Sequence, residues 1–129
     1  MESAPKLKIP AIRIPLDECL APVVDAAGAK TMTVVHPGEW IDVLPVLSVG
    51  QARRLVGLIG TNDDKAFAQE LSAIIVAWEM SDVLGVAFRP PWQDPTAIMD
   101  MFDRLSTEEQ AWIVRRLLNR ESPAERKNA

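Results

Sequence analysis

The sequence is poor in the residues on which much enzyme chemistry depends. Its 129 residues include one cysteine, one histidine and no tyrosine. Cys19 has no second cysteine with which to form an internal disulfide, as is typical of a protein from a reducing compartment. A zinc site needs a full set of ligands at suitable spacings, which Cys19 and His36 do not make. A histidine-dependent catalytic triad has only His36 to build on, and its His-Pro-Gly setting favours a turn.

Motifs for phosphate, calcium and paired-carboxylate chemistry are also missing. Gly57–Gly60 lies in an apolar stretch and lacks the Lys-Ser/Thr that follows a nucleotide-binding loop. Two pairs of adjacent acids occur, Asp17-Glu18 and Asp63-Asp64. Neighbouring side chains do not face each other on a helix, and neither pair has the alternating oxygen ligands of a calcium loop. The sequence therefore predicts a protein that is not an enzyme and needs no metal ion or cofactor.

The sequence has no excess of basic residues. Fourteen lysines and arginines stand against eighteen acids, giving a net charge of −4. A dedicated nucleic-acid-binding protein usually carries a basic excess that displaces counterions from phosphates. Arg115, Arg116 and Arg120 are predicted to lie on one helix face, and a solvated face is the simpler interpretation. Nucleic acid is therefore not expected as a partner.

No apolar run is long enough to cross a membrane. The longest, Ala73–Trp78, is far shorter than a bilayer-spanning helix requires. The first residues, Met1–Lys6, are polar and are not followed by the apolar stretch of a signal peptide. We therefore expect a cytoplasmic protein that does not enter a membrane.

What the sequence does contain is enough apolar material for one folded domain. Apolar residues make up 48% and charged residues 25%, which is ordinary for a globular protein. We expect a flexible N-terminal arm at residues 1–10 and a flexible C-terminal tail at 121–129. A single helical domain with an N-terminal β element is expected between them, at 11–120.

The N-terminal third has strand patterns. Ile12–Ile14 alternates apolar and polar residues between prolines, which predicts a short edge strand. Thr31–Val35 is rich in β-branched residues, and the turn residues His36–Glu39 separate it from Trp40–Leu44. These two segments are therefore predicted to pair with each other as a small hairpin.

Helical periodicity begins at residue 48 and predicts four short helices. The first starts at the capping box of Ser48 and Gln51 and buries Ala52, Leu55, Val56 and Ile59. The strongest apolar stripe follows a cap at Asp63 or Asp64 and includes Phe67, Leu71, Ile74, Ile75 and Trp78. Two more helices start at Asp94-Pro95 and at the capping box of Ser106 and Glu109. The predicted fold class is mainly α (α+β), a small N-terminal β-hairpin packed on a bundle of about four short helices.

Aromatic and basic residues outside the helical stripes are the candidates for binding a partner. Trp92 follows two prolines in a stiff connector, where it either anchors an interface or folds back over the helices. Trp40 is likewise open between core and contact, whereas Trp78 and Trp112 are assigned to the core. The predicted partner-binding residues are Trp40, Phe88, Trp92, Arg115 and Arg116.

The order of several short motifs is similar to that of a known family. Pro37–Asp42 combines glycine, an acid, tryptophan and a hydrophobic residue, and a polar helical segment follows. Ile74–Asp82 then contains the pattern hydrophobe-x-x-Trp-x-x-x-Asp, before Gly85 and a linker with prolines. Asp94–Ile98 leads into a terminal pair of helices. This order, over roughly residues 31–120, resembles the tail assembly chaperones of long-tailed, siphovirus-like bacteriophages.

The resemblance implies a protein without catalytic activity. Chaperones of this family bind the long, helical tape-measure protein, keep it soluble and deliver tail-tube subunits around it. They act in the host cytoplasm and are absent from the finished particle. Many also occur in a longer, frameshifted form, and the polar segment at 120–129 would suit such a junction. The linker at 86–92 is bulkier than the family's short proline linker, so no contact surface is carried over to it.

Self-association is a further expectation, and two other functions compete with the chaperone. The first is a structural phage or prophage protein, such as a tail-completion or connector protein, which would remain in the virion. The second is a small nucleic-acid-binding regulator that uses the face of Arg115, Arg116 and Arg120 and binds DNA in a salt-dependent manner.

Overall fold

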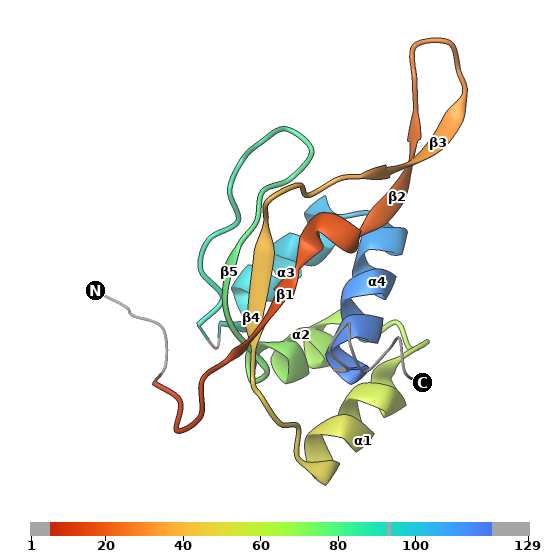
Figure 1. Cartoon of the computed structure of the whole chain (residues 1–129). Helices are drawn as coiled ribbons and strands as arrows, with labels where there is room; N and C mark the ends of the chain where they lie inside the picture. Colours follow the sequence, from red (N-terminus) through yellow and green to blue (C-terminus); the bar gives the residue numbers. More distant parts are fainter. Residues whose placement is uncertain (1–5, 93, 120–129) are drawn as a thin grey trace, which may run out of the picture.

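A three-stranded antiparallel sheet lies at the centre of the molecule (Figure 1). The computed structural model describes residues 6–92 and 94–119. The strand order is β1 (Ile12–Pro15), β4 (Trp40–Val43) and β5 (Ile75–Glu79). The two outer strands therefore come from opposite halves of the chain, and the strand between them joins these halves into one sheet.

The sheet is apolar on one face and polar on the other. Ile14 is opposite Ile41, and Ile41 is opposite Trp78, so these buried side chains share one face. On the other face, the Arg13 guanidinium forms an ion pair with the Asp42 carboxylate at 2.8 Å. This alternation makes only one face of the sheet available for packing against helices.

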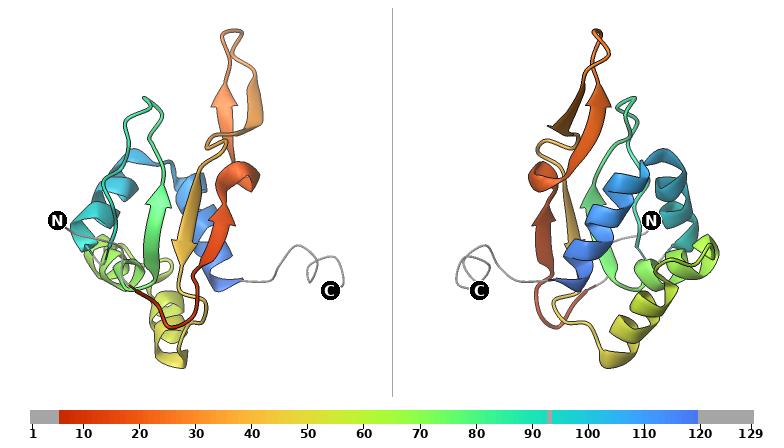
Figure 2. Two further views of the ribbon diagram at one scale, coloured as in Figure 1. Left: turned by 60° about the vertical axis from the view of Figure 1, so that its left-hand side comes forward. Right: turned by 90° about the vertical axis from the view of Figure 1, so that its right-hand side faces the viewer.

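Four α-helices lie in the described residues: α1 (Val49–Leu58), α2 (Asp64–Ser72), α3 (Pro95–Arg104) and α4 (Thr107–Leu118). Helices α2, α3 and α4 contribute most of the helical side chains that pack on the apolar face, and α1 packs mainly on α2, below the sheet in Figure 2. Each start has the predicted chemistry, with capping boxes at α1 and α4 and aspartate caps at α2 and α3. None of these helices is long and apolar enough to cross a bilayer.

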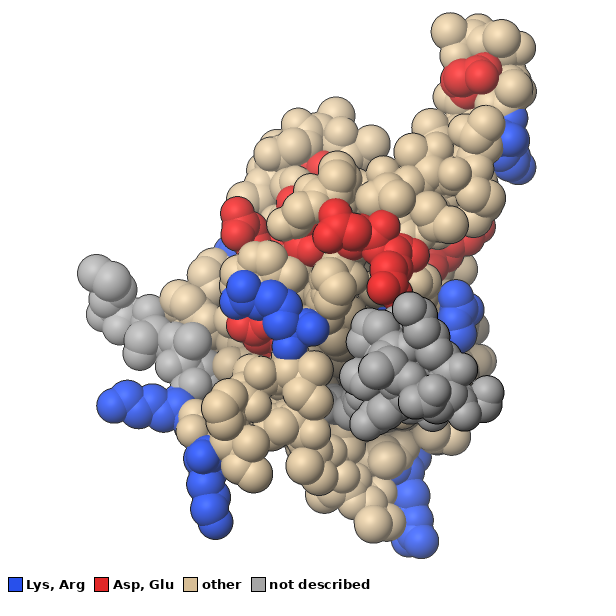
Figure 3. Space-filling view, viewed as in Figure 1, with Lys and Arg blue, Asp and Glu red and all other residues tan. Residues whose placement is uncertain are grey.

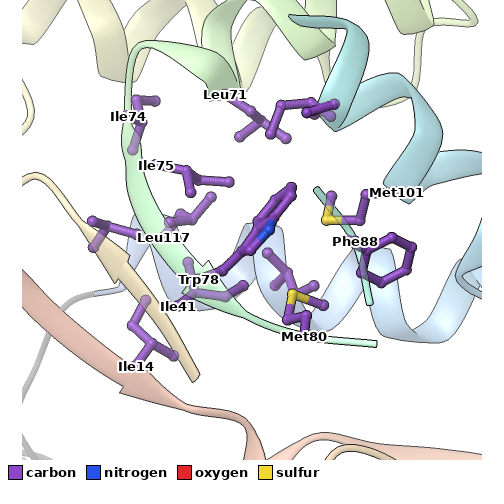
Figure 4. Close-up of a cluster of buried hydrophobic side chains, with 14 of the residues drawn as sticks. Ile14, Ile41, Leu71, Ile74, Ile75, Trp78, Met80, Phe88, Met101 and Leu117 are labelled. Carbon is purple, nitrogen blue, oxygen red and sulfur yellow. The ribbon is translucent and has the colours of Figure 1, made fainter. Parts of the chain in front are cut away.

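The core lies between the sheet and the helices. Trp78 of β5 points toward Leu71 of α2 and Met101 of α3, and Leu117 of α4 closes the same cluster (Figure 4). Leu71, Met101 and Leu117 have no exposed surface. The Trp78 indole N–H donates a hydrogen bond to the Arg89 carbonyl at 3.0 Å, which satisfies its polar atom inside the cluster.

A second sheet is separate from the first and has only two strands. β2 (Leu20–Val24) pairs antiparallel with β3 (Lys30–Val34), and a short 3₁₀ helix, η1 (Leu16–Glu18), joins β1 to β2. This β2–β3 hairpin projects beyond the body of the molecule (Figures 1 and 2). Its base contacts α4, where Ala21 is buried.

The predicted mainly α fold class is wrong, because five strands in two sheets accompany the four helices of the described residues. The main reason is the segment predicted as one long helix through Trp78. Helix α2 ends at Ser72, and Ile75–Glu79 forms β5 instead. Its Ile-Ile-Val sequence is β-branched, and β4 supplies a strand with which it can pair. Local helical spacing was therefore overridden by sheet pairing.

The predicted hairpin is also wrong, although both of its segments are strands. Thr31–Val34 lies in β3 and pairs with β2, whereas Trp40 and the rest of β4 pair with β1 and β5. The residues at 36–39 carry the chain from one sheet to the other, and the Leu16 N–H donates to the Glu39 carbonyl at this corner. Sequence analysis did not identify a strand at 20–24; Pro22 is accommodated there because β2 pairs only with β3 and its other edge is open in the described residues, where proline is tolerated.

Candidate partner-binding surfaces

His36 is the centre of a buried ionic network. Its side chain is 3% exposed, with Nδ1 2.7 Å from a Glu39 oxygen and Nε2 2.7 Å from a Glu109 oxygen. Glu39 also accepts a hydrogen bond from the Ser81 hydroxyl, and Glu109 is the capping-box residue of α4. The network therefore ties the corner between the sheets to the end of β5 and the start of α4.

Both nitrogens of His36 face carboxylates, which favours the charged imidazolium. Burial lowers the pKa of His36, but the hydrogen bonds and charges of Glu109 and Glu39 outweigh it, so the pKa is raised. Burial alone would raise the pKa of Glu109, but the hydrogen bond from His36 leaves it lowered. Because both nitrogens are engaged and the ring is buried, this group holds three segments together and has no nitrogen available to act as a general base.

Cys19 lies close enough to this network for the charge of Glu109 to affect the pKa of its thiol. The side chain is fully buried, and burial followed by the Glu109 charge raises the pKa of the thiol to about 11. At neutral pH it is a protonated thiol in the core, whereas a nucleophilic cysteine needs a thiolate. In the part of the chain that the structure describes, no group of three or more His, Cys, Asp or Glu side chains is arranged to hold a metal ion.

An apolar groove of about 490 Å³ lies between α2 and α4. Phe67 of α2 and Phe102 of α3 meet edge to face in it, with ring centroids 5.7 Å apart. Val114 and Leu118 line it from α4. The Gln110 amide donates to the Phe102 carbonyl at 2.6 Å, which holds α3 and α4 at a set angle beside the groove. The groove is therefore a preformed hydrophobic surface.

Helix α1 extends the apolar surface at the edge of this groove. Leu55 is buried as predicted, but Val56 is 56% exposed and Ile59 is 49% exposed, so the predicted burial of those two residues is wrong. The reason is that α1 packs mainly on α2, which covers only a narrow strip of its surface. Ile59 lines the groove directly, with Asp64 and Arg115 as charged residues at its margin.

The β2–β3 hairpin exposes one apolar face. Leu20, Pro22 and Val24 alternate along β2, and they are opposite Val34, Met32 and Lys30 of β3. The most exposed apolar residues of this set, Val24 and Met32, are both 61% exposed. Sequence reasoning missed this face, because the hairpin was assigned to other residues. The alternation at 20, 22 and 24 was the available signal.

A second projection, the loop at 81–87, rises from the same end of the molecule as the hairpin (Figure 2). Its tip exposes Val83 at 95% and Leu84 at 82%. The Asp82 carboxylate accepts the N–H groups of Leu84 and Val86, each at 2.9 Å, and pairs with Arg104. Hydrogen bonds from Val86, then Arg104 and Leu84, lower the pKa of Asp82. The apolar tip is therefore held in a defined conformation.

The predicted partner-binding residues are not brought together. Trp40 is half-buried on the polar face of the sheet, with the Arg13 guanidinium 3.7 Å from its ring centre. Phe88 is only 5% exposed and packs between Trp78 and Arg104, so in this conformation its ring offers little surface to a partner. Trp92 is half-buried, at the end of the described segment 6–92.

The predicted arginine strip is divided. Arg115 is exposed at the margin of the groove, whereas Arg116 is half-buried with its guanidinium 5.9 Å from the ring centre of Trp112. Arg120 lies outside the described residues, as do the predicted tail at 121–129 and much of the arm at 1–10. Arg115 and Arg116 thus have different surroundings on α4.

Comparisons with protein-family models, with curated proteins and with solved structures find no match to this chain. The functional interpretation therefore depends on the surfaces described above and on the order of the sequence motifs.

Proposed function

We propose that this protein is a non-catalytic chaperone of phage tail assembly that holds helical segments of the tape-measure protein in the host cytoplasm. The observation that carries the proposal is the apolar groove between α2 and α4. An amphipathic helix binds such a groove through apolar side chains spaced one turn apart. Tail-tube subunits are the second proposed partner.

The shape and chemistry of the groove fit a helix better than a small polar ligand. Its floor is made by the two phenylalanines, and its α4 wall presents Ala111, Val114 and Leu118, which are spaced about one helical turn apart. A volume of about 490 Å³ has room for several apolar side chains. Asp64 and Arg115 at the margin can pair with charges of either sign on the polar face of a client.

Exposed apolar residues outside the groove also support reversible holding of a client. Apolar residues of α1 and of the loop at 81–87 are exposed without a partner in the described residues. Exposed apolar surface of this kind marks interaction sites in soluble proteins. The net charge of −4 keeps such a protein soluble while its client site is empty.

The test is an affinity capture from cells that produce the parent phage or prophage, with partners identified by mass spectrometry. Wild-type protein should recover a very long helical protein together with tail-tube subunits, and purified virions should lack this chain. Val114→Glu places a charge in the groove and should reduce recovery of the helical protein at least tenfold. Val46→Glu is the matched control, because it adds the same charge at a valine that is 67% exposed and does not line the groove.

The projecting hairpin favours one other function, a structural tail-completion or connector protein, because such an arm suits permanent contact between subunits. That protein would be found in purified virions, where a chaperone would not. If folded Val114→Glu captured as much of the helical protein as wild type does, binding in the groove would be contradicted.

A further inference from the structure

The outer edge of β3 is open in the part of the chain that the structure describes. β3 pairs with β2 on one side and with no strand on the other. A strand edge of this kind presents a row of main-chain N–H and C=O groups that can pair with another chain. The hairpin also projects from the body, so its edge can be approached (Figure 1).

The hydrogen bonds at the two ends of the hairpin show which groups point outward. The Asp25 N–H donates to the Ala29 carbonyl at 2.9 Å, and the Val35 N–H donates to the Cys19 carbonyl at 3.4 Å. Antiparallel ladders alternate bonded and non-bonded pairs. In the regular register between these two bonds, the odd-numbered residues bond within the hairpin. The even-numbered residues therefore direct their N–H and C=O groups to its edges.

The two edges differ in their ability to pair. On β2 the outward set includes Pro22, which has no N–H, so this edge lacks a central donor. On β3 the outward set is Lys30, Met32 and Val34, each of which has both a donor and an acceptor. β3 is also free of proline and has its one charge at the end. The β3 edge is therefore better suited than the β2 edge to pair with a further strand.

We propose that β3 pairs antiparallel with β3 of a second copy of this chain, about a two-fold axis through Met32. Met32 then lies opposite Met32 of the second copy, and Lys30 lies opposite Val34. Each of these opposed pairs exchanges two main-chain hydrogen bonds, because every member directs its polar groups outward. The two hairpins form one four-stranded sheet with a continuous apolar face.

The charges of the hairpin favour pairing with a second copy of this chain over pairing with an unrelated strand. Between Leu20 and Val34 the β2–β3 hairpin carries only two charged residues, Asp25 and Lys30. Two hairpins can therefore approach without the repulsion expected between proteins of net charge −4. Antiparallel pairing brings Lys30 near the base of the other hairpin. Acidic residues lie at the base of the hairpin (Figure 3). Asp17 and Glu18 belong to η1, which contacts β3. The charges of the β2–β3 hairpin and its base are thus complementary to those of a second copy, as a two-fold interface requires.

The first test is site-specific crosslinking of the full chain with Met32→Cys. Opposed residues of a bonded pair have Cα atoms about 5.5 Å apart, which is within disulfide range. Mild oxidation should give a disulfide-linked dimer of twice 14.2 kDa. Thr31→Cys is the matched control, because Thr31 would lie opposite Thr33 of the second copy and not opposite itself. Wild type, whose Cys19 is buried, should not crosslink.

The second test is sedimentation of proline variants. Met32→Pro removes one outward N–H from β3, and Val24→Pro removes one from the β2 edge, so both leave the bonds within the hairpin. Wild type and Val24→Pro should sediment as dimers, and Met32→Pro as a monomer. Monomeric wild type at concentrations of about 100 μM, or crosslinking of Thr31→Cys as efficient as that of Met32→Cys, would overturn the proposal. The proposal does not depend on the tail-chaperone function.

Discussion

Protonation of His36 should contribute to the stability of the fold, and its loss should be measurable. A neutral imidazole has one N–H, so it can donate to only one of the two carboxylates that lie 2.7 Å from its nitrogens. Deprotonation therefore leaves Glu39 or Glu109 facing a lone pair. Because the side chains of Glu39 and Glu109 are only 18% and 13% exposed, water compensates poorly for this loss.

The direction of the pKa shift gives the pH window. The pKa of His36 is raised above its ordinary value of 6.5, so the stabilisation is fully present below pH 6.5 and is lost as the pH rises through the folded-state pKa. The free energy of unfolding should therefore fall from pH 6.5 toward pH 8.5. The upper limit avoids Cys19, whose raised pKa of about 11 causes a separate loss of stability above pH 9.0.

Substitution of His36 removes the cation outright. His36→Ala leaves two largely buried carboxylates without it, and breaking a buried pair in this way costs about 3–5 kcal/mol. Since a domain is typically stable by about 5–15 kcal/mol, this variant should be close to unfolding. His36→Gln keeps an amide donor and is the milder variant for the pH series.

Urea unfolding followed by tryptophan fluorescence measures this prediction for wild type and His36→Gln. The chain has only one histidine, so the α-amino group is the main other group that titrates in the window, and both proteins share it. The difference in pH slope therefore reports His36. The reasoning is refuted if both proteins have the same slope, or if the single imidazole NMR signal titrates at or below pH 6.5.

Three further predictions concern packing and capping, and thermal and urea unfolding of each variant checks them. Phe88→Ala should destabilise the fold by about 3–5 kcal/mol, because the ring is buried against Trp78; a loss below about 1 kcal/mol would contradict its place in the core. Trp92→Ala should cost clearly less, since Trp92 is half-buried, and an equal loss would show that it is core. Ser48→Ala should cost about 1 kcal/mol by removing the capping bond to the Gln51 N–H, and an unchanged midpoint would be inconsistent with that bond.

Local structure could be predicted from the sequence wherever a few neighbouring residues determine it. The starts of the helices at Ser48, Asp94 and Ser106 follow from side chains that satisfy the first free N–H groups, and they are confirmed. Leu55 and Leu71 are buried because they lie on the apolar faces of α1 and α2, as their spacing predicted.

Only part of the candidate site could be predicted from the sequence. Phe67 was recognisable as an apolar helix residue, but the groove that it lines with Leu118 depends on how α2 and α4 are placed in space, which no local pattern encodes. His36 was recognisable as a turn residue. Its burial depends on Glu109, which is 73 positions away in the chain.

Pairing between distant segments was decided only by the tertiary structure. Ile75–Glu79 has helical spacing taken alone, and it becomes a strand because β4 offers it hydrogen-bonding partners and the core accepts its side chains. Thr31–Val34 pairs with a proline-bearing strand for the same reason. The sequence by itself thus determined the helix starts and many of the buried residues. Strand partners, the groove and the ionic network of His36 required the folded chain, because each is formed by groups that are adjacent only in space.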